Sequence, residues 1–72
     1  MNIYAITPKG RNALSDRLSG NEMEVLVTLD NASDMGMGSE EVGYILKMPM
    51  FRVDRVLEAL SNAGLVRVTG VE

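Results

Sequence analysis

Seventy-two residues are enough for one domain at most, and a chain this short buries only about 60% of the surface that its unfolded form exposes. Hydrophobic residues make up 46% of the sequence, which excludes an intrinsically disordered chain. The formal net charge of −3 argues against a protein that bulk electrostatics holds to nucleic acid, although the local field of one face matters more than the sum.

The residue types that supply most catalytic and metal chemistry are missing. The chain has no cysteine and no histidine, so it lacks the commonest strong nucleophile and the commonest general base. A metal site would have to be built from carboxylates alone. We therefore expect no enzyme activity, no metal and no cofactor. Without disulfides or zinc, dimerisation is the remaining way for a small domain to gain buried area, and a homodimer is expected.

No apolar run approaches the roughly 20 residues that span a bilayer. The first four residues have no basic region leading into an apolar one, and so do not have the pattern of a secretory signal. We expect a cytoplasmic protein that does not bind membranes.

The chain opens with a short β-prone run at residues 3–6. Thr7 is expected to cap a first helix in which Pro8 takes the first position. Gly10 weakens that helix by about 1 kcal/mol relative to Ala. One side of the helix carries three apolar residues: Ala13, Leu14 and Leu18.

Two overlapping capping boxes, Ser19 with Glu22 and Asn21 with Glu24, predict the start of a second helix. This helix continues to about Asp30. Its expected buried residues are Met23, Leu26, Val27 and Leu29.

Residues 31–38 are a predicted loop, in which two glycines flank Met37 and allow it to add a short strand to a sheet. Ser39 is the expected N-cap of a third helix, and Glu40 and Glu41 suit the positive end of its dipole. The residues of this helix that should face the core are Val42, Ile45 and Leu46.

The strongest periodic signal is an apolar stripe with the i, i+3, i+4, i+7 spacing of one helix face: Val53, Val56, Leu57 and Leu60. Pro49 stands where this helix can start, and Gly64 fits the left-handed position that ends helices. Residues 65–69 then predict a strand. A short helix, a turn, a longer helix and a strand follow one another in the order of a helix-turn-helix with a wing.

Residues 46–66 resemble the winged helix-turn-helix regulators of the MarR, ArsR and PadR type. The pattern of these regulators has leucines at the ends of the turn, an apolar pair in the recognition helix and an L-x-x-A-G-L-V ending. The matching residues here are Leu46, Met48, Val53, Leu57, Leu60, Ala63, Gly64, Leu65 and Val66. With residues 40–45 and the following strand, the resemblance covers roughly the second half of the chain.

Residues 4–11 resemble a second signature, Y-x-L-T-x-x-G-R, of PadR-like and MarR-like proteins. In that family the signature is the second wing strand leading into a helix, and it follows the recognition helix. Here it comes first, and only residues 70–72 follow the predicted strand. We therefore expect the N-terminal strand to pair with the C-terminal one, either within the chain or across a dimer.

The resemblance implies a DNA-binding protein, a transcriptional regulator that places the helix of residues 50–63 in the major groove of double-stranded DNA. By the same resemblance, the positions near bases are Met50, Phe51, Arg52, Asp54 and Arg55. Arg52 and Arg55 lie three residues apart on one face, where each can bind guanine or phosphate, or remain a solvated surface charge. Residues that can add phosphate contacts are Lys47, Arg67, Lys9 and Arg11.

A protein-interaction module without nucleic-acid binding is the alternative, because the pattern also occurs in winged helices that bind proteins. Phe51 either packs inward against the preceding helix or forms an exposed apolar patch with Met48 and Met50, and methionine-rich surfaces suit protein partners. A contiguous patch of Lys47, Arg52, Arg55 and Arg67 would favour DNA, and a divided one would favour a protein.

The predicted fold is α+β, a single winged-helix domain over residues 1–72 with three or four helices and a two- or three-stranded antiparallel sheet. A purely helical domain with frayed ends is the alternative. The expected core is Ile6, Leu14, Leu18, Leu26, Leu29, Val42, Ile45, Leu46, Val53, Val56, Leu57, Leu60, Leu65 and Val66.

Overall fold

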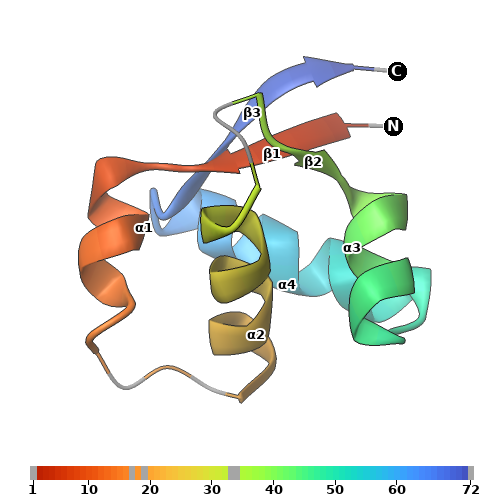
Figure 1. Cartoon of the computed structure of the whole chain (residues 1–72), viewed down its shortest axis with the longest axis horizontal. Coiled ribbons are helices and arrows are strands. Elements are labelled where there is room, and N and C mark those ends of the chain that lie inside the picture. The colour runs from red at the N-terminus through yellow and green to blue at the C-terminus, as the bar shows by residue number, and fades with distance from the viewer. Residues whose placement is uncertain (1, 17, 19, 33–34, 72) are drawn as a thin grey trace.

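The computed structural model describes residues 2–16, 18, 20–32 and 35–71, which form four helices and three strands (Figure 1). In chain order the elements are β1 (Asn2–Ile6), α1 (Pro8–Ala13), α2 (Gly20–Asp30), β2 (Met37–Gly38), α3 (Ser39–Leu46), α4 (Met50–Asn62) and β3 (Val66–Val71). The α+β prediction is confirmed, and the purely helical alternative is wrong. None of the helices in the described ranges is long and apolar enough to cross a membrane.

The sheet is antiparallel, in the order β2-β1-β3, and covers one side of the helices (Figure 1). β1 pairs with β3 within the chain, with Ile6 opposite Val66 and Tyr4 opposite Val68, so the predicted pairing of the N-terminal strand with the C-terminal one is confirmed. The short strand expected at Met37 is also present. The register shifts between Ile3 and Tyr4, which bends the outer part of the β1–β3 ribbon.

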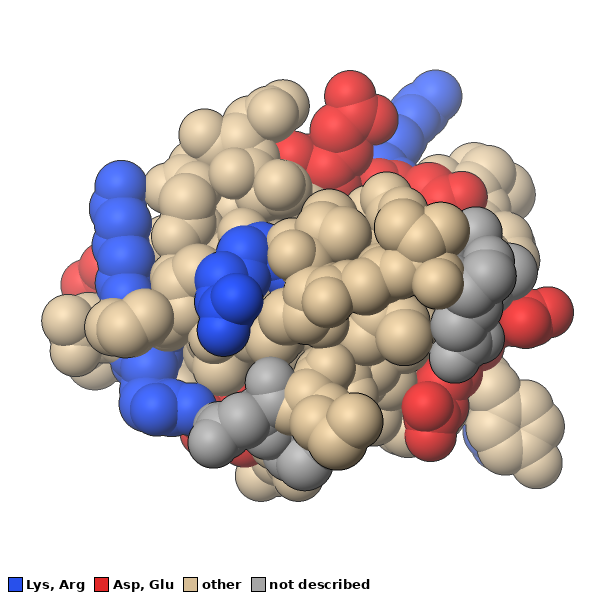
Figure 2. Space-filling view, turned by 90° about the horizontal axis from the view of Figure 1, so that it is seen from above, with Lys and Arg blue, Asp and Glu red and all other residues tan. Residues whose placement is uncertain are grey.

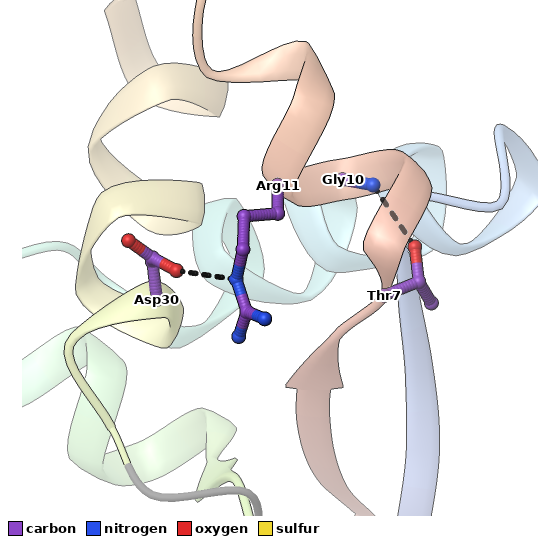
Figure 3. Close-up of polar contacts among 4 residues, drawn as sticks. All are labelled: Thr7, Gly10, Arg11 and Asp30. Carbon is purple, nitrogen blue, oxygen red and sulfur yellow. Dashed lines mark hydrogen bonds and ion pairs between the residues drawn. The ribbon is translucent and has the colours of Figure 1, made fainter.

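Thr7 starts α1 as the sequence predicts. Its Oγ1 accepts a hydrogen bond from the Gly10 N–H at 3.0 Å (Figure 3). Pro8 takes the first helical position. The same hydroxyl donates to the Gly64 carbonyl at 2.7 Å, and the Thr7 N–H donates to the Leu65 carbonyl at 3.0 Å. One residue therefore caps α1 and joins it to the connection between α4 and β3.

The first helix is shorter than expected, because it ends at Ala13 and does not reach Leu18. After Ala13 the hydrogen bonds span three residues, and the Ser15 hydroxyl donates to the Asn12 carbonyl, which competes with helix continuation. Leu14, the C-cap of α1, and Leu18 still pack against the core from beyond the end of the helix.

Two of the predicted N-caps, Asn21 and Ser39, are wrong. α2 begins at Gly20, so Asn21 is already helical and does not cap it. The capping box of Ser19 falls outside the described residues. The N-cap of α3 is Gly38, and Ser39 is the first helical residue, with its side chain buried.

The α1–α2 contact includes an ion pair between Arg11 Nε and Asp30 Oδ1 at 3.0 Å (Figure 3). The Arg11 side chain is 58% exposed, so water screens the pair and its contribution to stability is small. Arg11, one of the basic residues expected to contact phosphate, is therefore already paired with a carboxylate.

The core lies between the sheet and the helices, and most of the predicted core residues are buried in it or packed against it. Its largest fully buried side chains are Leu26, Leu29, Leu57, Leu60, Val25, Val42 and Val53. Ile45 and Val27 are 49% and 42% exposed, so their predicted burial is wrong. Each lies beside the buried stripe of its helix rather than in it, and the stripe of α2 runs through Val25 instead.

Gly10 is needed at the crossing of α1 and the α4–β3 connection, because an added Cβ would overlap the Leu65 carbonyl oxygen and lie 2.9 Å from Ile6 Cγ1. We expect Gly10→Ala to lower the free energy of unfolding by about 1–3 kcal/mol, despite the better helix propensity of alanine. Urea unfolding followed by circular dichroism measures the change.

The matched control is Gly20→Ala, at a helical glycine with nothing within 4 Å of the added Cβ. This variant should be as stable as the parent or more stable, by up to about 1 kcal/mol. Equal stability of the Gly10→Ala protein and its parent would contradict the steric assignment.

Candidate nucleic-acid interface

The turn between α3 and α4 is three residues long. Lys47 ends α3 in the left-handed conformation, with φ 56°, and its N–H donates to the Gly43 carbonyl. The Met48 N–H donates to the same oxygen at 2.9 Å, and Pro49 then precedes α4 as its N-cap. A Cβ on Gly43 would lie 3.0 Å from the Met48 carbonyl oxygen, so this glycine permits the close approach of the two helices.

α4 turns its apolar stripe to the core and carries its basic residues elsewhere. Its buried residues are Val53, Val56, Leu57 and Leu60. Arg52 and Arg55 are exposed, and neither forms an ion pair with a residue in the described ranges, Asp54 and Glu58 included. Two guanidinium groups, three residues apart, are thus available for an external acceptor.

The apolar residues at the start of α4 face solvent. Phe51 is 65% exposed, so the predicted inward packing against the preceding helix is wrong, and Met50 is 36% exposed. On α3, Tyr44 is 86% exposed and Ile45 is 49% exposed, whereas Met48 is partly buried against the core. The two helices therefore present apolar surface as well as cations.

Arg67 lies apart from the basic residues of α4. It lines a hollow of about 290 Å³ together with Arg11, beside α1 and α2. The thirteen residues of α4, about 20 Å of helix, lie between Lys47 in the turn and the connection to β3. The Lys9 side chain passes over Gly64 in that connection.

The predicted basic set is therefore divided. Lys47, Arg52 and Arg55 belong to the turn and the first half of α4. Arg67 shares a hollow with Arg11 of α1, beyond the other end of α4. Lys and Arg side chains gather at the left of Figure 2, the side on which α1 lies in Figure 1.

A groove of about 770 Å³, which the sequence analysis did not anticipate, separates α4 from the β1–β3 ribbon. Its lining residues are Asn2, Tyr4, Ser39, Met50, Asp54, Glu58, Ser61, Asn62 and Val68. Tyr4 and Val68 are partners in the sheet register, and Asp54 and Glu58 are one turn apart on α4. The lining contains two carboxylates and no Lys or Arg.

The chain matches no family model, no curated protein and no solved structure in comparisons with known proteins. No group of three or more acidic side chains is placed to hold a metal ion within the described part of the chain. The residues of the candidate site are cations and apolar side chains around the turn and carboxylates in the groove.

The left-handed Lys47 strains the turn, because an L-residue pays roughly 1–2 kcal/mol for that conformation and glycine does not. We expect Lys47→Gly to raise the free energy of unfolding by about 1 kcal/mol. Lys47→Ala, which removes the charge and keeps the Cβ, should give no such gain. A thermal unfolding series on the three proteins compares them, and equal gains for both variants would point to the charge instead.

Proposed function

We propose that the chain is a DNA-binding winged helix-turn-helix domain that places α4 in the major groove. The observation that carries the proposal is the group of cations around the turn: Lys47, Arg52 and Arg55 are exposed and form no ion pair with the described residues. A helix-turn-helix reads bases with the first turns of its second helix, and the two arginines occupy those turns.

The sheet supports the proposal through its topology. β1 overlaps the first three residues of the run that resembles Y-x-L-T-x-x-G-R, and in the resembling regulators this run is the second wing strand leading into a helix. β1 pairs antiparallel with β3, the strand that follows α4, and then leads into α1. The β1–β3 ribbon thus takes the place of the wing, although its two strands come from opposite ends of the described chain.

The positions of the charged residues determine which of them can contact DNA in this proposal. Arg52 and Arg55 can each form a forked contact with guanine or hold a phosphate, and Lys47 can hold a phosphate as a point charge. Asp54 and Glu58 face the groove, so phosphates are repelled from the space between α4 and the ribbon. DNA approaches along the outer side of α4, and Arg67 lies outside this interface.

A single domain with three such cations gains few contacts. Pairing of two copies doubles the contacts and sets the spacing of two half-sites, which is how helix-turn-helix dimers recognise symmetric operators. We therefore include a homodimer and a role in transcription regulation in the proposal.

We expect Arg55→Ala and Arg52→Ala each to weaken binding of a mixed-sequence duplex by at least about 1 kcal/mol, or roughly fivefold in Kd. Fluorescence anisotropy at low salt and at moderate salt measures the affinity. The dependence of affinity on salt concentration should also become less steep in both variants. With one phosphate contact fewer, binding releases fewer counterions from the DNA.

Arg67→Ala is the matched control. It also removes one arginine, but from β3, beyond the other end of α4. Its affinity should stay within about twofold of the parent. Equal losses for all three variants would indicate a diffuse charge effect and no defined interface, and failure of the parent to bind at low salt would reject DNA binding.

A protein-interaction module is the second candidate, because exposed Tyr44, Ile45 and Phe51 leave apolar side chains on both helices of the turn. Such surfaces commonly mark interaction sites when they are contiguous. In this case Phe51, rather than Arg55, supplies the binding energy.

Phe51→Ser should abolish capture of a protein partner and leave the fold intact, since the side chain is 65% exposed and removing it opens no cavity. Pull-down followed by mass spectrometry compares the parent and the variant, with Arg55→Ala as the control that keeps the aromatic ring. A partner retained by Phe51→Ser would count against this candidate.

A further inference from the structure

The groove between α4 and the β1–β3 ribbon is acidic and unneutralised. Asp54 and Glu58, four residues apart, bring two carboxylates to the same wall. Neither forms an ion pair with the described residues, and no basic side chain lines the groove. A cation that enters the groove therefore meets two free acceptors.

Ser39 provides a second, independent sign of a ligand. It lines the groove at the start of α3 and is only 3% exposed, yet none of the described residues hydrogen bonds to its hydroxyl. No fully buried side-chain nitrogen or oxygen among the described residues lacks a hydrogen-bond partner. The Ser39 hydroxyl has no such partner, so it must retain some contact with solvent, and Ser39 lines the groove. Water satisfies this hydroxyl in the free protein, and a ligand that fills the groove can replace that water as its hydrogen-bond partner.

The remaining lining is suited to an extended chain. Tyr4 and Asn2 contribute a phenol and an amide from β1, and Ser61 and Asn62 contribute a hydroxyl and an amide from the end of α4. Val68 and Met50 add apolar contacts for the aliphatic part of a long side chain. The volume, about 770 Å³, exceeds what one ion needs and fits several side chains.

We propose that this groove binds an arginine- or lysine-bearing segment of a partner protein. The carboxylates of Asp54 and Glu58 pair with the cationic heads, and Ser39 accepts a hydrogen bond from the segment. Nucleic acid is disfavoured in the same space, because its phosphates would face two carboxylates at close range. The inference goes beyond DNA binding and does not depend on it, since the arginines of α4 lie outside the groove lining.

The probe is a short fluorescein-labelled peptide of alternating arginine and glycine, titrated into the full chain and followed by anisotropy. The double variant Asp54→Asn/Glu58→Gln keeps the shape of the groove and removes its charge, and we expect it to weaken binding at least about tenfold, or roughly 1.4 kcal/mol. The matched control, Glu40→Gln/Glu41→Gln, removes the same charge from α3 residues that do not line the groove, and should change the Kd less than about twofold.

Nuclear magnetic resonance locates the peptide. Amide shifts should change at Tyr4, Ser39 and Ser61 and stay constant around Arg11, and Ser39→Ala should weaken binding a fewfold without altering the spectrum of the free protein elsewhere. Equal losses in the two double variants, or shift changes spread over all acidic surfaces, would reduce the interaction to bulk charge attraction and overturn the proposal. Shift changes confined to Tyr44 and Phe51 would assign the peptide to the apolar surface of the turn and overturn it as well.

Discussion

The rest of the structure depends on the hydrogen bonds that Thr7 donates to the carbonyl groups of Gly64 and Leu65. At this point β1 becomes α1 and α4 becomes β3, and the two changes of direction are tied by the Thr7 hydroxyl, the Thr7 N–H and the bare Cα of Gly10. Gly64 takes the left-handed conformation, with φ 76°, that the sequence predicts for the end of α4. The angle between the β1–β3 ribbon and α4 is set here, and with it the groove.

α4 has three faces with different roles in this arrangement. One stripe builds the core, a second lines the groove with carboxylates, and a third carries two arginines into solvent. An acidic chain can therefore present a local cationic surface, because the carboxylates of α4 face the ribbon rather than the arginines. The net charge of −3 describes the sum of these faces and none of them individually.

Local signals in the sequence predicted much of the fold. Three of these signals depend on neighbouring residues: the Thr7–Pro8 cap, the periodic stripe of α4 and Gly64. The pairing of the N-terminal strand with the C-terminal one was predicted because the sequence offers no other strand-like run of comparable length. All four are present. The failures have physical causes too. A run of apolar residues does not show which side of a short helix meets the core, so Ile45 was placed inside.

The candidate site was less accessible to sequence reasoning. Periodicity shows that Arg52 and Arg55 share a helix face, but it does not give the distance from α4 to Arg67 on another element. The groove depends on the sheet register, which brings Tyr4 opposite Val68 and both beside α4. β1 and β3 are separated by four helices in the sequence, so the spacing of residues along the chain does not predict which residues of the two strands lie opposite each other.

The pairing of β1 with β3 also has a consequence for how quickly the protein folds. Asn2 lies opposite Val71, so this contact joins residues 69 positions apart along the chain, whereas the α3–α4 contacts are local. The entropy of closing a long loop has to be met before the ribbon contributes any stability, which slows folding relative to a bundle of helices of the same size. The groove between α4 and the β1–β3 ribbon therefore depends on the contacts that cost the most loop entropy to form.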